Sequence, residues 1–162
     1  METYHNKIKT LEAARDECDR IKRSGKRVVF TNGCFDILHP GHTRYLSSAR
    51  GLGDFLVVAV NSDHSVRIIK GSKRPILAEQ ARAELIAALE CVDLVLIFDE
   101  DNPLRVIQNL LPDILVKGGD WSEDEIIGAD VVKAAGGRVM RIPFVKGFST
   151  TDIIRRVVDL ST

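Results

Sequence analysis

Residues 28–42 read VVFTNGCFDILHPGH, and this stretch decides the fold expected for the whole chain. It opens with a short apolar run, Val28–Phe30, whose residue types favour a buried β-strand. Asn32-Gly33 ends the run, and a helix is predicted from Gly41 to Ala49. In an open α/β sheet, ligands bind beyond the carboxyl ends of the strands. The loop between this strand and this helix is therefore a candidate ligand site.

The rest of the chain repeats this alternation of apolar strands and helices. Four more short apolar segments are predicted as strands, at 55–60, 94–98, 114–116 and 138–142. Further helices are predicted at 7–24, 78–90, 103–111, 122–135 and 152–160. Strands that are apolar on both faces and alternate with helices indicate a parallel sheet covered on both sides. We therefore expect an α/β fold with a Rossmann-like, doubly wound, five-stranded parallel sheet and helices on both faces.

A single domain is expected over residues 1–162, with an N-terminal helix at about 7–24 and a catalytic core at about 26–160. No internal repeat or linker divides it. The one long irregular stretch, residues 67–77, carries four basic residues. Two interpretations stay open for this stretch, a mobile basic loop beside a ligand and a solvated surface loop.

The composition narrows the class of protein. The chain has 44% hydrophobic and 28% charged residues, and 23 basic residues balance 23 acidic ones. A net charge of zero gives no support for a nucleic-acid binder with a basic surface. Three dispersed cysteines do not form a disulfide framework, and we see neither a signal peptide nor an apolar run long enough to span a membrane. A cytoplasmic protein without nucleic-acid or membrane partners is expected.

The loop after the first strand has the residue types that phosphate chemistry needs. Glycines let the backbone approach a phosphate, and a helix start offers free N–H groups to an anion. His39 and His42 lie at that helix start and can donate hydrogen bonds to oxygens that gain charge during phosphoryl transfer. Three alternatives stay open: histidines that only cap the helix, a metal site that includes Cys34, and a simple turn. No G-x-G-x-x-G or G-x-x-x-x-G-K-[ST] pattern follows the strand.

Residues 33–42, GCFDILHPGH, resemble the G-x-F-D-x-x-H-x-G-H signature of the cytidylyltransferase-like nucleotidyltransferases. The resemblance implies that His39 and His42 bind a triphosphate and stabilise the transition state at the α-phosphorus. It also implies that the backbone around Gly33, Cys34, Phe35 and Gly41 lines the nucleotide, and that Asp36 braces the loop. The resemblance extends from about residue 26 to about residue 158.

Two glycine-containing segments follow later strands. Residues 117–121, KGGDW, form either a glycine turn with a packing tryptophan or a base-recognition loop. Residues 147–151, GFSTT, form either a helix cap or a site for the β- and γ-phosphates. The resemblance favours the nucleotide in both cases, and it implies contacts from Gly118, Asp120, Trp121, Gly147, Phe148, Ser149, Thr150 and Thr151. Phe144 departs from some members, which carry an arginine there, so their mode of contact is in doubt.

Several charged residues are candidates for the acceptor substrate. Lys70 is predicted to bridge the α-phosphate and the phosphate of the incoming substrate, because a lysine can neutralise both anions. Lys73 and Arg74 are weaker candidates for the same role. Arg82 faces either the pocket or the surface, and Asp63 either caps a helix or touches substrate.

Within the family, the chain is most similar to the heptose 1-phosphate adenylyltransferases of lipopolysaccharide core synthesis, in residues 28–42, 60–63, 74–76, 115–121 and 142–154. This implies ATP as co-substrate, Mg²⁺ held mainly by its phosphates, and a sugar phosphate as acceptor. Because the chain has no room for a kinase domain, a separate sugar kinase is expected upstream, and a homodimer is possible among relatives of this kind. Two rivals stay open, a cytidylyltransferase acting on glycerol 3-phosphate and a non-catalytic nucleotide-binding module.

Overall fold

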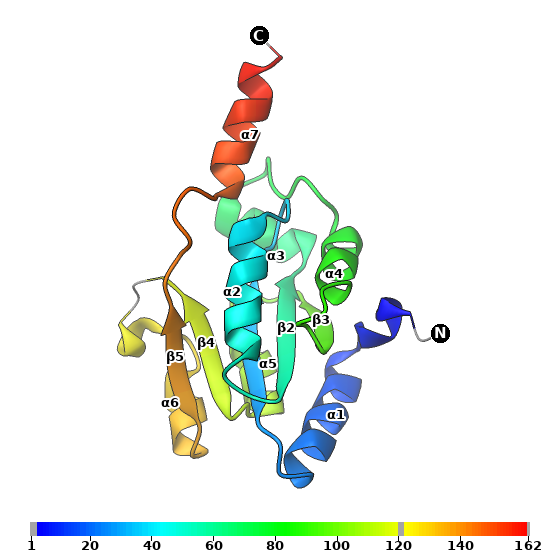
Figure 1. Ribbon diagram of the computed structural model, residues 1–162, viewed down its shortest axis with the longest axis vertical. Helices are drawn as coiled ribbons and strands as arrows, with labels where there is room; N and C mark the ends of the chain where they lie inside the picture. Colours follow the sequence, from blue (N-terminus) through cyan, green and yellow to red (C-terminus); the bar gives the residue numbers. More distant parts are fainter. Residues whose placement is uncertain (1–2, 120–121, 162) are drawn as a thin grey trace.

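The computed structural model of the protein describes residues 3–119 and 122–161, and it is built on one five-stranded sheet (Figure 1). All strand pairs are parallel, and the order is β3-β2-β1-β4-β5. The strands are β1 (Val28–Gly33), β2 (Phe55–Asn61), β3 (Leu94–Phe98), β4 (Ile114–Gly118) and β5 (Arg138–Ile142). The expected five-stranded parallel sheet is confirmed, and the order reverses direction at β1, as in a doubly wound fold.

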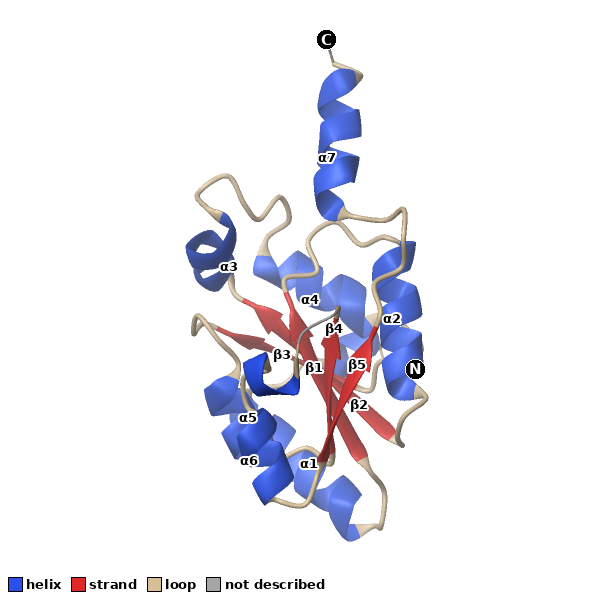
Figure 2. Cartoon of the chain, turned by 90° about the vertical axis from the view of Figure 1, so that its left-hand side faces the viewer, coloured by secondary structure: helices blue, strands red, loops and turns tan. Residues whose placement is uncertain are grey.

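Helices cover both faces of this sheet, as Figure 2 shows. One face carries α1 (Leu11–Arg23), α5 (Leu104–Leu110) and α6 (Ala129–Ala134), and the other carries α2 (Pro40–Arg50) and α4 (Glu79–Ala87). Because side chains alternate along a strand, Phe30 and Leu115 enter the first core while Val29 and Ile114 enter the second. No helix among the described residues is long and apolar enough to cross a membrane.

The central strands separate towards their carboxyl ends. The paired register of β1 and β4 covers only Val29–Phe30 against Ile114–Leu115, although the strands continue to Gly33 and Gly118. A doubly wound sheet opens its ligand crevice at this point, between the two strands where the order reverses. The fold therefore places the loop after β1 and the end of β4 on either side of one crevice.

Two further helices lie at this same end of the sheet. The first, α3 (Asp63–Lys70), follows β2, and the second, α7 (Thr150–Asp159), follows β5 and extends away from the sheet (Figure 1). The side-chain oxygen of Ser62 caps α3, and that of Ser149 caps α7. The expectation of an irregular stretch over 67–77 is wrong in its first part, because α3 continues to Lys70.

Two predicted helices have different bounds from those expected. The first helix does not begin at residue 7. A 3₁₀ turn at Tyr4–Lys7 comes first, and Ile8 is then extended and pairs with Val95. Thr10 caps α1, which starts at Leu11. The helix predicted at 122–135 is interrupted by Gly128, whose φ of +85° lies in the left-handed region. A 3₁₀ turn at Glu123–Glu125 precedes this break, and α6 follows it.

The ends of α6 offer a matched pair of glycines for testing the packing. Gly128 and Gly136 have almost the same φ, +85° and +86°. They differ in their surroundings, because a Cβ at Gly128 would lie 2.7 Å from Cδ1 of Ile107, whereas a Cβ at Gly136 would meet nothing within 4 Å. We expect Gly136→Ala to lower the free energy of unfolding by about 1 kcal/mol, through backbone strain alone. Gly128→Ala should lower it by about 2–4 kcal/mol, because overpacking adds to the strain. Urea denaturation measures both, and equal losses would contradict the packing argument.

Candidate active site

The carboxylate of Asp36 holds the loop after β1 to the segment that follows α3. It accepts hydrogen bonds from Nε of Arg74 at 2.8 Å and from the N–H groups of Ile76 and Leu77 at 2.8 and 3.0 Å. The Asp36 side chain is fully enclosed. Burial alone raises the pKa of this carboxyl, but the three hydrogen bonds and the charge of Arg74 outweigh it, and the pKa lies below 3.8. Asp36 is therefore ionised and fixes the shape of the loop.

The loop itself is strained. Phe35 and Ile37 have φ values of +47° and +53°, a region that residues with a Cβ rarely adopt. Gly33 is required beside them, because a Cβ there would lie 3.0 Å from Cε2 of Phe35. The contacts of Asp36 hold this strained conformation in the loop that leads into α2.

His39 and His42 form a stacked pair at the start of α2. Their ring centroids are 3.8 Å apart with an interplanar angle of 19°, and Phe35 meets the His42 ring edge-on at 5.4 Å. Gly41 makes this stacking possible, because a Cβ would lie 2.8 Å from Cε1 of His39. Nδ1 of each histidine is buried without a hydrogen-bond partner within the described part of the chain. Buried polar nitrogens usually have partners, so this pair is suited to a polar ligand.

Both histidines are neutral at pH 7. The pKa of His42 is lowered from 6.5 to about 4, chiefly by burial and to a smaller extent by the neighbouring His39, while Asp36 opposes the shift. Burial also lowers the pKa of His39. Two imidazolium rings could not share this stack, so each histidine provides one N–H donor rather than a positive charge.

The start of α7 lies against this pair. The Phe148 ring is stacked near His39, with centroids 6.3 Å apart and an interplanar angle of 16°, and the guanidinium of Arg44 lies 5.4 Å from the Phe148 ring centroid. The Thr150 hydroxyl donates to the backbone carbonyl of Asp36 at 2.7 Å. Gly147, which precedes Phe148, has a φ of +87°. Ser149 caps α7, and Thr151 is exposed in the first turn of this helix. The structure thus brings the 147–151 segment to the histidine loop.

Arg82 is not a surface residue. Its side chain is fully buried and donates to the carbonyls of Cys34 and Leu77 at 2.6 and 2.9 Å, and to a carboxylate oxygen of Asp63 at 2.9 Å. The surface alternative is therefore wrong. Three of its five N–H donors are used within the protein, and the predicted contact of Arg82 with substrate stays a prediction. Arg82 connects the histidine loop to the start of α3, where Asp63 begins the helix.

Three lysines of the candidate site differ in their exposure. Lys70, at the end of α3, and Lys73 are both exposed, and no hydrogen bond or ion pair holds either side chain within the described residues. Burial raises the pKa of Cys34, and the charge of Lys70 opposes this shift; the same charge also acts on Lys117. Lys117 is the next-to-last residue of β4 and is partly buried. Burial lowers its pKa, and Cys34 opposes this shift.

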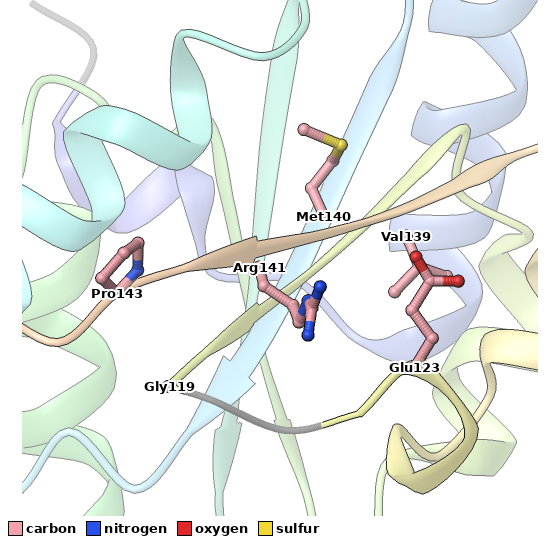
Figure 3. A pocket seen from close by; sticks show the side chains of 6 residues that line it. All are labelled: Gly119, Glu123, Val139, Met140, Arg141 and Pro143. Carbon is pink, nitrogen blue, oxygen red and sulfur yellow. The ribbon is translucent and has the colours of Figure 1, made fainter.

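The end of β4 borders a groove of about 500 Å³ (Figure 3). Gly119, Glu123 and Arg141 line it with Val139, Met140 and Pro143. The Phe144 ring lies over Gly118 and Gly119 at the end of β4. A Cβ at Gly119 would lie 2.6 Å from Cε2 of Phe144, and a Cβ at Gly118 would lie 3.1 Å from Cε1 of Phe144. Phe144 is nevertheless 74% exposed. The predicted contacts of Asp120 and Trp121 lie outside the described residues.

Residues 30–156 match the cytidylyltransferase-like family. The chain belongs to this family. The nucleotidyltransferase class expected from residues 33–42 is confirmed by this match, which includes the histidine loop, the Lys117–Gly119 segment and the start of α7.

Bacterial relatives of this family member are named bifunctional protein HldE. The protein from Syntrophotalea carbinolica is 54% identical over 156 residues, covering 96% of this chain and 32% of that protein. The protein from Citrifermentans bemidjiense is 56% identical over 153 residues, covering 94% and 31%. The chain therefore spans about a third of the length of these relatives.

Solved structures support the same fold. A lipopolysaccharide core biosynthesis protein from Thermoplasma volcanium has a TM-score of 0.61 and 32% identity, covering 76% of this chain and 100% of that one. Pantothenate synthetase from Thermus thermophilus has a TM-score of 0.60 at 18% identity, covering 91% and 67%, and shows the fold alone.

Two site features were missed by the sequence reasoning. Lys117 was considered only as part of the 117–121 segment, as a glycine turn or a base-recognition loop, although its place directly before Gly118 at the end of a predicted strand was a usable signal. Arg44 was not singled out, and nothing in the local sequence indicates that it lies over Phe148.

We expect Asp36→Ala to lower the free energy of unfolding by about 3–5 kcal/mol, because it leaves the enclosed Arg74 guanidinium and two N–H groups without acceptors. Asp152→Ala is the matched control, since Asp152 pairs with Arg155 on the exposed surface of α7. That change should cost less than about 1 kcal/mol. Urea denaturation measures both variants. A loss for Asp36→Ala no larger than that of the control would show that the loop is not held by this carboxylate.

Stability should also depend on pH through His42. The unfolded chain takes up a proton at this residue near pH 6.5, whereas the folded chain does so only near pH 4. The free energy of unfolding should therefore fall as the pH drops from about 6.5 to about 4, and His42 should contribute no slope above that window. Comparing denaturation of the wild type and His42→Asn isolates this slope. His64→Asn, at an exposed histidine, should keep the wild-type slope.

Proposed function

We propose that the protein transfers an adenylyl group from ATP to a heptose 1-phosphate, giving ADP-heptose and pyrophosphate. The observation that carries the proposal is the stacked pair of neutral histidines, whose Nδ1 atoms are buried without partners at the start of α2. In the reaction, an oxygen of the sugar phosphate attacks the α-phosphorus of ATP. The bond from that phosphorus to the bridging oxygen breaks, and the electron pair leaves with pyrophosphate. No protein nucleophile is needed.

His39 and His42 act at the α-phosphate in this proposal. A neutral imidazole donates one hydrogen bond, and donors that are already in place stabilise charge that develops on phosphate oxygens in the transition state. The contacts of Asp36 and the stacking against Phe35 support the role, because they keep both rings oriented before substrate binds. The loop backbone at Gly33, Cys34 and Gly41 lines the nucleotide.

The leaving pyrophosphate is held by the start of α7. Ser149, Thr150 and Thr151 come directly after Gly147-Phe148 and offer hydroxyls and a helix N-terminus to an anion. The hydrogen bond from Thr150 to the Asp36 carbonyl supports this role, since it ties the phosphate-binding turn to the histidine loop. Lys70, with Lys73 as a weaker candidate, neutralises both the α-phosphate and the phosphate of the incoming sugar phosphate.

In this proposal, Mg²⁺ is held mainly by the phosphates of ATP. Within the described residues no group of three or more histidine, cysteine or acidic side chains is placed to hold a metal ion. Asp36, the acidic group whose charge acts on His42, already accepts three hydrogen bonds. When bound to the phosphates, Mg²⁺ offsets the negative charge of the leaving group.

The base and the acceptor are the finer parts of the proposal. The groove beside Gly119, with the exposed Phe144 ring over Gly118, offers room and an apolar surface for adenine. The heptose is supported by the resemblance noted above, by the relatives named HldE and by the similarity to a lipopolysaccharide core biosynthesis protein. A sugar kinase would supply the phosphorylated heptose in the cytoplasm, and the enzyme would act as a homodimer.

A nucleotide and acceptor panel tests this function. Pyrophosphate release should be fastest with ATP and a heptose 1-phosphate, and slower with CTP or with glycerol 3-phosphate. A preference for CTP and glycerol 3-phosphate would instead support the cytidylyltransferase alternative. Tight ATP binding without turnover would support a non-catalytic module.

We expect His39→Ala and His42→Ala each to lower kcat by about a hundredfold or more, because each removes a donor to the transition state. His64→Ala provides the control, since His64 is exposed on α3. Circular dichroism should show that all three variants are folded. Full activity in either active-site variant would rule out the proposed role of the pair.

A further inference from the structure

Lys117 differs from the other enclosed cations of the protein. Among residues 3–119 and 122–161, the lysine and arginine residues that are not exposed are Lys7, Lys22, Arg50, Arg74, Arg82 and Lys117. The first five all donate hydrogen bonds to carbonyl or carboxylate oxygens of the protein. Lys117 has no hydrogen bond or ion pair within the described residues. A partly buried ammonium group without an anion is costly, so a ligand is the natural source of its partner.

The place of Lys117 in the fold points to the ligand crevice. Lys117 lies two residues beyond the last paired position of β4 with β1, where the two strands have separated. The loop that carries Cys34 leaves β1 at the same edge of the sheet. Lys117 therefore borders the switch-point crevice from the β4 side, opposite the elements that follow β1 and β2.

A second cation reaches the same place from the other side of β1. Lys70 ends α3, which follows β2, and its charge acts on both Cys34 and Lys117. Burial lowers the pKa of Lys117, and the positive charge of Lys70 lowers it further, against an opposing effect of Cys34. Two lysines that repel each other across a crevice favour a ligand with at least two negative charges.

We propose that Lys117 and Lys70 together bind the phosphate group of the acceptor substrate. This inference rests on the proposed function, in which the triphosphate already has its own partners in the histidine pair and the start of α7. The acceptor phosphate must reach the α-phosphorus beside the Cys34 loop, and it carries two charges near neutral pH. Two lysines on opposite sides of the loop would hold it there and reduce its repulsion from the nucleotide.

Steady-state kinetics of the full chain test this assignment. Lys117→Met keeps the length and the apolar stem of the side chain but removes the charge. We expect it to raise KM for the sugar phosphate by about ten- to a hundredfold, with KM for ATP changed less than about threefold. Lys117→Arg should keep KM within about threefold of wild type, because the charge remains. Lys26→Met, at an exposed lysine before β1, should leave both constants unchanged.

Other outcomes overturn the proposal. A rise in KM for ATP alone would assign Lys117 to the nucleotide phosphates. Unchanged constants would show that Lys117 binds neither substrate. Thermal unfolding of Lys117→Met should match the wild type, so that a loss of binding is not a loss of folding.

A second measurement does not require turnover and separates this proposal from the proposed function. Inorganic phosphate should slow alkylation of Cys34 by iodoacetamide, read by mass spectrometry of its peptide, because it would occupy the space between the two lysines. The protection should be present in the wild type and Lys117→Arg and lost in Lys117→Met. Equal protection in all three, or none in the wild type, would contradict the site. If protection follows this pattern but no heptose phosphate is turned over, the phosphate site stands and the assigned sugar is wrong.

Discussion

The enclosed carboxylate of Asp36 is the contact on which the rest of the site depends. It holds the 74–77 segment through three hydrogen bonds, and the carbonyl of the same residue accepts from Thr150 at the start of α7. Arg82 adds a further connection from the Cys34 carbonyl to Asp63 at the start of α3. Segments that are far apart in sequence are thus fixed around one strained loop. Such strain persists only where surrounding contacts determine the conformation.

The sheet decides where this loop can act. Because β1 and β4 stop pairing after Phe30 and Leu115, their last residues line an opening rather than a continuous ladder. The histidines follow one of these strands and Lys117 lies at the end of the other. The histidine loop and Lys117 are therefore brought to the same end of the sheet by the topology, although they are far apart in sequence.

Local pattern was enough to predict the five strands and the histidine loop, because buried parallel strands and a ten-residue signature are local features. It was not enough where tertiary contacts decide. Ile8 has the spacing of a helix residue but pairs with Val95, and Gly128 interrupts a helix whose pattern continues through it. The burial of Arg82 and the isolation of Lys117 depend on what packs around them, and neither can be read from neighbouring residues.

The neutrality of the histidines explains why the site needs other cations. The two partly buried rings are stacked 3.8 Å apart, and burial, aided by the neighbouring His39, lowers the pKa of His42 to about 4. They can donate hydrogen bonds to a phosphate but cannot neutralise it. Positive charge must then come from groups at the edges of the crevice, where water lowers the cost of keeping them charged. In the proposed reaction, exposed Lys70 and partly buried Lys117 supply that charge, so that hydrogen-bond donation and charge neutralisation are carried by different residues.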